Sequence, residues 1–133
     1  MGRTRTRTGA GIVLDTGALI ALERGDKRMI ALLRRALAQG RAFRVPAGVV
    51  GQVWRNSRVQ VTLARFLRSE EVEIVPLDDQ LARACGELCG AASSSDVIDA
   101  SVVILARERQ DLIVTSDPGD IRRLDPAAQI VKL

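Results

Sequence analysis

The chain has 133 residues, of which 47% are hydrophobic and 27% are charged, and its formal net charge is +4. This length and this hydrophobic content predict one folded domain with a proper core, and they exclude a disordered chain. The sequence contains no histidine. That absence excludes Ser-His-Asp and Cys-His catalysis and most zinc sites, so catalysis here would have to use carboxylates, hydroxyls, Cys, Lys, Arg or a metal ion.

The first residues, "MGRTRTRT", carry three arginines and no acid. Their lack of apolar side chains predicts a disordered basic tail over residues 1–9, with contact to phosphates as a secondary role, followed by a single domain over residues 10–133. The tail lacks the apolar segment of a signal peptide, and no stretch of the chain reaches transmembrane length. We therefore expect a cytoplasmic protein with no membrane contact.

Short apolar runs alternate with stretches of helical spacing along the rest of the chain. The apolar runs predict strands at residues 11–15, 42–46, 72–77, 111–115 and 129–133. The helical spacing predicts helices at residues 16–25, 27–40, 47–56, 58–69, 78–92 and 97–110. This alternation indicates β–α–β units and hence an α/β fold around a mainly parallel sheet of four to five strands.

The two cysteines, Cys85 and Cys89, lie four residues apart and share one face of the helix predicted at 78–92. A zinc site would need two more soft ligands, which the sequence does not contain. We therefore expect buried free thiols, which suit a reducing compartment.

Aspartates gather where the predicted strands end. Asp15 closes the first strand, and Asp117 and Asp120 follow the fourth. Asp96 and Asp99 lie at the start of the helix that leads into the fourth strand. Because right-handed crossovers align the carboxyl ends of parallel strands at one edge of the sheet, these acids should face a common crevice.

Carboxylates that converge in one site raise each other's pKa values unless a cation balances their charge. Hard oxygen ligands without His or Cys favour Mg²⁺ or Mn²⁺. A divalent cation of this kind suits phosphodiester hydrolysis, with Thr115 and Ser116 placed to orient ligands or waters.

Each acid also has a structural interpretation. Asp15 and Asp96 precede predicted helices and suit the N-cap position, and Asp120 could cap the short turn that follows it. Asp117 begins an Asp-Pro-Gly sequence that is typical of turns. Asp99 is the hardest to explain structurally, since it lies inside a helix between apolar residues.

Four segments, in order and spacing, resemble the PIN-domain ribonucleases, and more specifically the VapC-type toxins of bacterial toxin–antitoxin pairs. The resemblance spans nearly all of residues 11–133. The four segments are "IVLDTGALIAL" (12–22), "VPAGVVGQVWR" (45–55), "DVIDASVVILARER" (96–109) and "IVTSDPGDI" (113–121).

The resemblance implies a three-layer α/β/α fold and metal-dependent cleavage of RNA, often tRNA or rRNA. By motif, Asp15, Asp99 and Asp117 match the family acids that bind Mg²⁺ or Mn²⁺ and carry catalysis. Asp96 matches a nearby extra acid and is expected to assist in holding the metal, and Asp120 is a further acid beside the site.

Two positions depart from the family pattern. Gln52 stands where the family has a glutamate on the helix after the second strand, and an amide contributes no charge. Gly17 stands where the family often has a hydroxyl, with Thr16 one position earlier. The loss of the glutamate predicts weaker metal binding, and it leaves open an alternative function, a catalytically weakened module that binds RNA or an antitoxin. A receiver-like domain ranks last, because Lys27 and Lys132 are poorly placed for it.

The resemblance also implies a homodimer and a small cognate antitoxin that inserts a helix into a groove. The helices over 47–67 offer an apolar contact for it that includes Trp54, although core packing is the simpler role of that residue. Basic residues on the same segment are candidates for contact with RNA phosphates, or they form a solvated helix face. These residues are Arg55, Arg58, Arg65 and Arg68.

Overall fold

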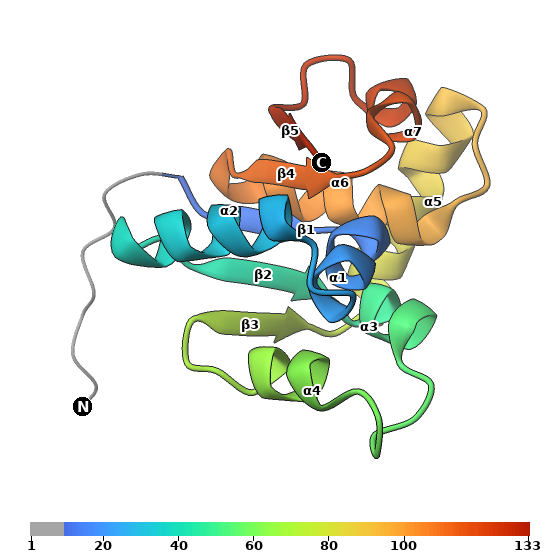
Figure 1. Cartoon of the computed structure of the whole chain (residues 1–133). Helices are drawn as coiled ribbons and strands as arrows, with labels where there is room; N and C mark the ends of the chain where they lie inside the picture. Colours follow the sequence, from blue (N-terminus) through green and yellow to red (C-terminus); the bar gives the residue numbers. More distant parts are fainter. Residues whose placement is uncertain (1–9) are drawn as a thin grey trace, which may run out of the picture.

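The computed structural model describes residues 10–133, in which five parallel strands form the centre of the molecule (Figure 1). The strands are β1 (Ile12–Leu14), β2 (Phe43–Pro46), β3 (Val72–Val75), β4 (Leu112–Thr115) and β5 (Ile130–Lys132). Their order in the sheet is β3-β2-β1-β4-β5, and every pairing is parallel. The predicted parallel sheet is therefore confirmed, with β1 and β4 side by side in its middle.

Helices cover both faces of this sheet. They are α1 (Thr16–Glu23), α2 (Lys27–Ala38), α3 (Ala47–Val53), α4 (Val61–Leu67), α5 (Asp79–Ala92), α6 (Val97–Arg109) and α7 (Pro118–Leu124). Figure 1 shows α1 and α2 over one face and α6, backed by α5, over the other. The three-layer α/β/α architecture implied by the resemblance is confirmed.

The core follows from the apolar runs that predicted the strands. Strands β1 and β4 are buried along nearly their whole length, as expected for parallel strands that are covered on both faces. Phe43 of β2 packs edge-to-face against Phe66 of α4, with ring centroids 5.7 Å apart. Cys85 and Cys89 are buried free thiols on one face of α5, as predicted.

The predicted helix at 58–69 begins later than expected, at Val61. Gln60, only 6% exposed, closes the preceding loop with its side chain. Its Oε1 accepts hydrogen bonds from the backbone N–H groups of Arg55 and Asn56, and its Nε2 donates to the carbonyl of Val53. All three backbone groups therefore bind the one side chain of Gln60, which holds the loop between α3 and α4 in a turn.

The turn after β4 also differs from its prediction. It is a helix, α7, which begins at Pro118 with Asp117 in the N-cap position. Proline suits the first position of a helix because its missing N–H has no partner there in any case. Asp120 therefore lies inside the first turn of α7, and the prediction that it caps a turn starting at Ile121 is wrong.

Within residues 10–133, no single helix is both long and apolar enough to span a membrane; α5 and α6 meet that criterion only jointly, as a pair bent by 105°. The basic tail predicted over residues 1–9 lies outside the described residues.

Candidate active site

Asp15 is placed by the junction of β1 and α1. It caps α1, since its Oδ1 accepts a hydrogen bond of 2.9 Å from the backbone N–H of Ala18, so its structural interpretation as an N-cap is confirmed. The residue is only 7% exposed. Burial raises the pKa of the Asp15 carboxyl, with a further contribution from the charge of Asp117, against the opposing effect of hydrogen bonds from Thr115 and the start of α1. The fold thus places the Asp15 carboxyl where burial disfavours its ionised form.

Asp99 lies in the first turn of α6 and is half-buried. Asp96 caps this helix, with its Oδ1 accepting a hydrogen bond of 2.9 Å from the backbone N–H of Asp99, as its N-cap interpretation predicted. Burial, followed by repulsion from the carboxylates of Asp96, Asp120 and Asp15, raises the pKa of Asp99 to about 7. Asp99 is therefore the acid whose ionisation is opposed by three other aspartates of the group.

Asp117 and Asp120 come from the segment after β4 and are both exposed. The backbone N–H of Asp117 donates to Thr115 Oγ1 over 2.9 Å, which fixes the turn at the end of the strand. A hydrogen bond between the two side chains, together with the charge of Asp117, raises the pKa of Asp120. These two acids therefore interact directly with each other.

The carboxyl ends of β1 and β4 and the start of α6 thus bring together the five predicted aspartates. Each of the raised pKa values has other members of the group among its causes. Within residues 10–133, no ion pair with Arg or Lys engages Asp15, Asp99 or Asp117. The site therefore has surplus negative charge that the described part of the chain does not balance.

The donor set of this site fits a hard divalent cation, because it consists of carboxylate oxygens with uncompensated charge. Residues 10–133 contain no ready-made cluster of three or more acidic or thiol side chains that would hold a metal ion in the arrangement shown. Asp15 and Asp96 each use one carboxylate oxygen as a helix cap.

Gln52 also lies at this edge, on α3, and its Oε1 accepts a hydrogen bond from the hydroxyl of Thr16. The bond joins α3 to the first residue of α1, directly after Asp15. The amide oxygen is therefore already engaged by the protein, and the position adds no charge to the site.

Gly48 on α3 is a residue that sequence reasoning missed. A Cβ at this position would lie 2.3 Å from Cδ1 of Ile98, the residue before Asp99. The glycine therefore leaves room for the end of the Ile98 side chain against α3. Its only signal in the sequence was a glycine within a predicted helix, where the residue is otherwise unfavourable.

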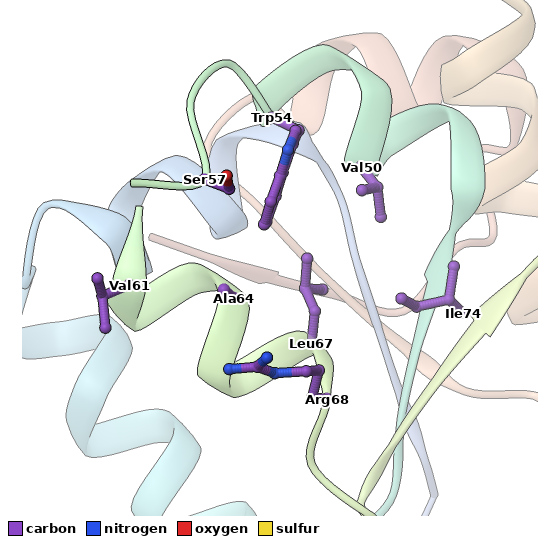
Figure 2. A pocket seen from close by; sticks show the side chains of 8 residues that line it. All are labelled: Val50, Trp54, Ser57, Val61, Ala64, Leu67, Arg68 and Ile74. Atoms are coloured by element: carbon purple, nitrogen blue, oxygen red, sulfur yellow. The ribbon is translucent and has the colours of Figure 1, made fainter. Parts of the chain in front are cut away.

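A separate apolar pocket of about 530 Å³ lies between α3, α4 and β3. In Figure 2 the ring of half-buried Trp54 extends into it, with Val50 and Ile74 along the wall. Trp54 also packs against the core, so its predicted core role and its exposure to a surface hollow are both observed. The lining residues are Val50, Trp54, Ser57, Val61, Ala64, Leu67, Arg68 and Ile74.

The arginines predicted to contact RNA are exposed, and one of them, Arg68, lines this pocket. The guanidinium of Arg55 donates to the carbonyl oxygens of Gly51 and Trp54 and is thereby tied to the end of α3. Arg58 and Arg65 lie on the loop before α4 and on α4 itself. The segment 47–69 contains four arginines and no acid, so this surface is positively charged.

Comparison with known proteins agrees with this geometry. A family profile described as "PIN domain" matches residues 12–125. A comparison with curated proteins gives no match.

Several solved structures share the fold. A toxin–antitoxin complex from Klebsiella pneumoniae aligns with a TM-score of 0.69 at 15% identity, covering 92% of this chain and 97% of that one. VapBC2 from Rickettsia felis, bound to a promoter DNA fragment, aligns with a TM-score of 0.65 at 16% identity, covering 91% and 97%. VapC20 from Mycobacterium tuberculosis, a toxin that cleaves the sarcin–ricin loop, aligns with a TM-score of 0.60 at 18% identity, covering 77% and 87%.

Proposed function

The chain belongs to the PIN-domain family, and on that premise we propose that it is a metal-dependent endoribonuclease and the toxin of a toxin–antitoxin pair. The observation that carries the proposal is the group of uncompensated aspartates at the carboxyl ends of β1 and β4, with Asp99 at a pKa of about 7. Strongly raised carboxyl pKa values at a strand-end crevice are typical of functional sites in α/β proteins. The structural neighbours that are toxins or toxin–antitoxin complexes support the biological role.

In this proposal Asp15, Asp99 and Asp117 are the catalytic acids, and together with Asp96 they hold Mg²⁺ or Mn²⁺. When bound, such an ion would help to activate water for attack and would offset the negative charge that develops during phosphodiester hydrolysis. Thr115 orients Asp15 through its hydroxyl, and Asp120 orients Asp117. Asp99, with its pKa of about 7, shifts from protonated to ionised over the neutral range, so metal binding should strengthen as the pH rises through 7.

The supporting contact of Thr16 with Gln52 holds α1 beside α3 and so sets one wall of the site. The exposed arginines Arg55, Arg58 and Arg65 contact phosphates of the RNA on the neighbouring surface. Such contacts contribute affinity without base specificity.

The partner in this proposal is a cognate antitoxin, and the apolar pocket of Figure 2 receives an apolar side chain of its inserted segment. Exposed apolar residues at the pocket rim, Val61 at 52% and Ile74 at 40%, provide the surface that such contact would bury. The protein acts as a homodimer in the cytoplasm.

Asparagine substitution of the acids tests the function directly. We expect Asp15→Asn and Asp99→Asn each to abolish Mn²⁺-dependent cleavage of total cellular RNA while circular dichroism shows an intact fold. Asp79→Asn is the matched control, because Asp79 is an exposed acid on α5 that pairs with Arg83, away from the site. Wild-type cleavage by both site variants would place the activity elsewhere or in a contaminant.

Gln52 favours a second candidate, a PIN-fold module that binds RNA or antitoxin without turnover. Its amide adds no charge and its oxygen is engaged by Thr16. This candidate predicts RNA or antitoxin binding with no new RNA 5′ ends at any concentration of Mg²⁺ or Mn²⁺. A metal-titrated cleavage assay with mapping of 5′ ends decides between the two.

A further inference from the structure

Three residues with hydroxyl side chains lie at the ends of β1 and β4 near Asp15, and the protein uses the hydroxyls of two of them. Thr16 donates to Gln52. Thr115, which is fully buried, accepts from the backbone N–H of Asp117 and also contacts Asp15. Ser116 is exposed, and its hydroxyl makes no hydrogen bond to any group within residues 10–133. It is therefore the hydroxyl that remains available to a ligand.

The Ser116 side chain lies directly against Gly17 of α1. A Cβ at position 17 would stand 2.1 Å from Ser116 Oγ and 3.1 Å from Ser116 Cβ. The hydroxyl in its present place and a side chain at position 17 therefore exclude each other. The backbone of Gly17 is helical and does not itself require glycine, so the absence of a side chain serves to make this room.

We propose that the Ser116 hydroxyl contacts the substrate by donating a hydrogen bond to a phosphate oxygen of the RNA beside Asp15. Gly17 positions this hydroxyl, because the absence of a side chain at position 17 leaves the space that the hydroxyl occupies. The inference rests on the proposed function, since it takes RNA as the substrate. An RNA phosphate that enters this site meets the carboxylates of Asp15 and Asp117, which offer it no hydrogen-bond donor when ionised. The neutral hydroxyl of Ser116, which precedes Asp117 in the chain and lies against the first turn of the helix that Asp15 caps, supplies a donor. A hydrogen bond to a charged partner is stronger than one between neutral groups.

Substitution of the two positions tests the pair. We expect Ser116→Ala to lower kcat/KM for RNA about tenfold or more, the usual effect of losing one hydrogen bond to a charged group. Gly17→Ala should lower kcat/KM by a similar factor, because the new methyl group forces the hydroxyl to rotate away. Its Tm should change little, because the preference of a helix for alanine over glycine opposes the tight 3.1 Å contact with Ser116 Cβ. Gly86→Ala on α5 is the matched control, since a Cβ there meets nothing within 4 Å.

The double variant Gly17→Ala/Ser116→Ala separates this role from a general effect of packing. If the only role of Gly17 is to leave space for the Ser116 hydroxyl, the double variant loses no more activity than Ser116→Ala alone. The exchange Gly17→Ser/Ser116→Gly returns a hydroxyl to the same space from α1, and it should recover part of the lost kcat/KM. Wild-type kcat/KM for Ser116→Ala, or losses that simply add in the double variant, would overturn the inference while leaving the nuclease assignment intact.

A binding assay decides the inference if the wild-type chain cleaves no RNA and the proposed function fails. The probe is a fluorescently labelled single-stranded RNA of random sequence, measured by anisotropy with wild-type protein and with Ser116→Ala. Weaker binding by Ser116→Ala, by about tenfold, supports the contact. Equal binding by the two proteins, or no binding by either, overturns it.

Discussion

The fold surrounds a buried cation, Arg44, and two acids at the site, buried Asp15 and half-buried Asp99, in opposite ways. Arg44 of β2 has a side chain that is only 6% exposed, and a backbone carbonyl and two glutamates lie near it, while its Nε makes no hydrogen bond within residues 10–133. Its guanidinium donates to the carbonyl of Leu105 and lies 3.7 Å from Glu73 and 3.5 Å from Glu108. Asp15 and Asp99, by contrast, have no ion pair within residues 10–133 and repel one another.

This difference separates a structural charge from a functional one. A charge that only stabilises a fold needs its counter-charge within the chain, because desolvation without a partner is costly. Acids that are left unbalanced at the ends of strands persist only where something else, here a proposed divalent cation, supplies the missing charge. The contrast predicts which substitutions reduce activity and which reduce stability.

The largest effect is expected on the unbalanced side. Asp117→Asn should lower Mn²⁺-dependent RNA cleavage about a thousandfold, since a proposed metal ligand loses its charge and metal stabilisation contributes several kcal/mol to the transition state. Asp120→Asn should cost less than about a hundredfold, the range for a group that only orients a ligand. Cleavage rates at saturating Mn²⁺ measure both, and equal losses would show that the two acids have the same role.

On the balanced side the expected effect is on stability. Arg44→Ala should lower the free energy of unfolding by about 2–3 kcal/mol, because it leaves a cavity and the Leu105 carbonyl without its donor. The loss should fall short of that for a fully buried ion pair, since Glu73 and Glu108 are about half-exposed and can be hydrated.

Arg44→Met is the matched control, because it keeps most of the buried volume and should cost less than Arg44→Ala. Chemical denaturation measures both variants, and cleavage per folded molecule should remain at the wild-type level. Loss of cleavage in a folded Arg44→Met variant would contradict the separation between structural and functional charges.

An acid introduced at position 52 should increase the excess of negative charge at the aspartate site, and so should increase its contrast with the paired charge of Arg44. Gln52→Glu places another carboxylate beside Thr16 and Asp15, where the amide now accepts from the Thr16 hydroxyl. We expect Mn²⁺ affinity to increase about tenfold, the scale of effect for a group near a metal site, and cleavage at low Mn²⁺ to rise with it. Isothermal titration gives the affinity, and unchanged Mn²⁺ binding would show that position 52 does not face the metal.

Local sequence patterns predicted the strands and every helix except α7 within residues 10–133, and they predicted the general position of the acids. The run Ile12–Leu14 followed by Asp15 placed an acid at a strand end, and that placement is confirmed. The same patterns left the structural and functional interpretations of these acids open, and the N-cap interpretation holds for both Asp15 and Asp96.

What the patterns could not predict are contacts between segments that are distant in the sequence. The hydrogen bond of Thr16 with Gln52 joins residues 36 positions apart, and that of Arg44 with Leu105 joins residues 61 apart. The packing of the Ser116 side chain against Gly17 likewise depends on how α1 lies beside the end of β4. Such contacts are set by the packing of whole elements, so no local propensity encodes them. The roles of the individual acids were implied by the family resemblance and remain a proposal.

The smallest expected effect is the pH dependence of stability in the absence of a divalent ion. The pKa of Asp99 is raised from 3.8 to about 7, so between these pH values the folded chain binds a proton that the unfolded chain has released. The contribution of Asp99 to the free energy of unfolding therefore falls as the pH rises through this window and levels off above it. Burial of Asp15 raises its pKa and acts in the same direction.

Thermal unfolding of wild type and Asp99→Asn between pH 5 and pH 8, in the presence of a chelator, measures this contribution. The two proteins should differ least at pH 5, and the variant should become relatively more stable toward pH 8, because it lacks the charge that ionisation creates. Added Mn²⁺ at pH 8 should stabilise the wild type and have little effect on the variant. If the difference in Tm between the two proteins is the same at every pH, Asp99 carries no unbalanced charge. The contrast with Arg44 then fails, because the fold would balance the charges of both residues.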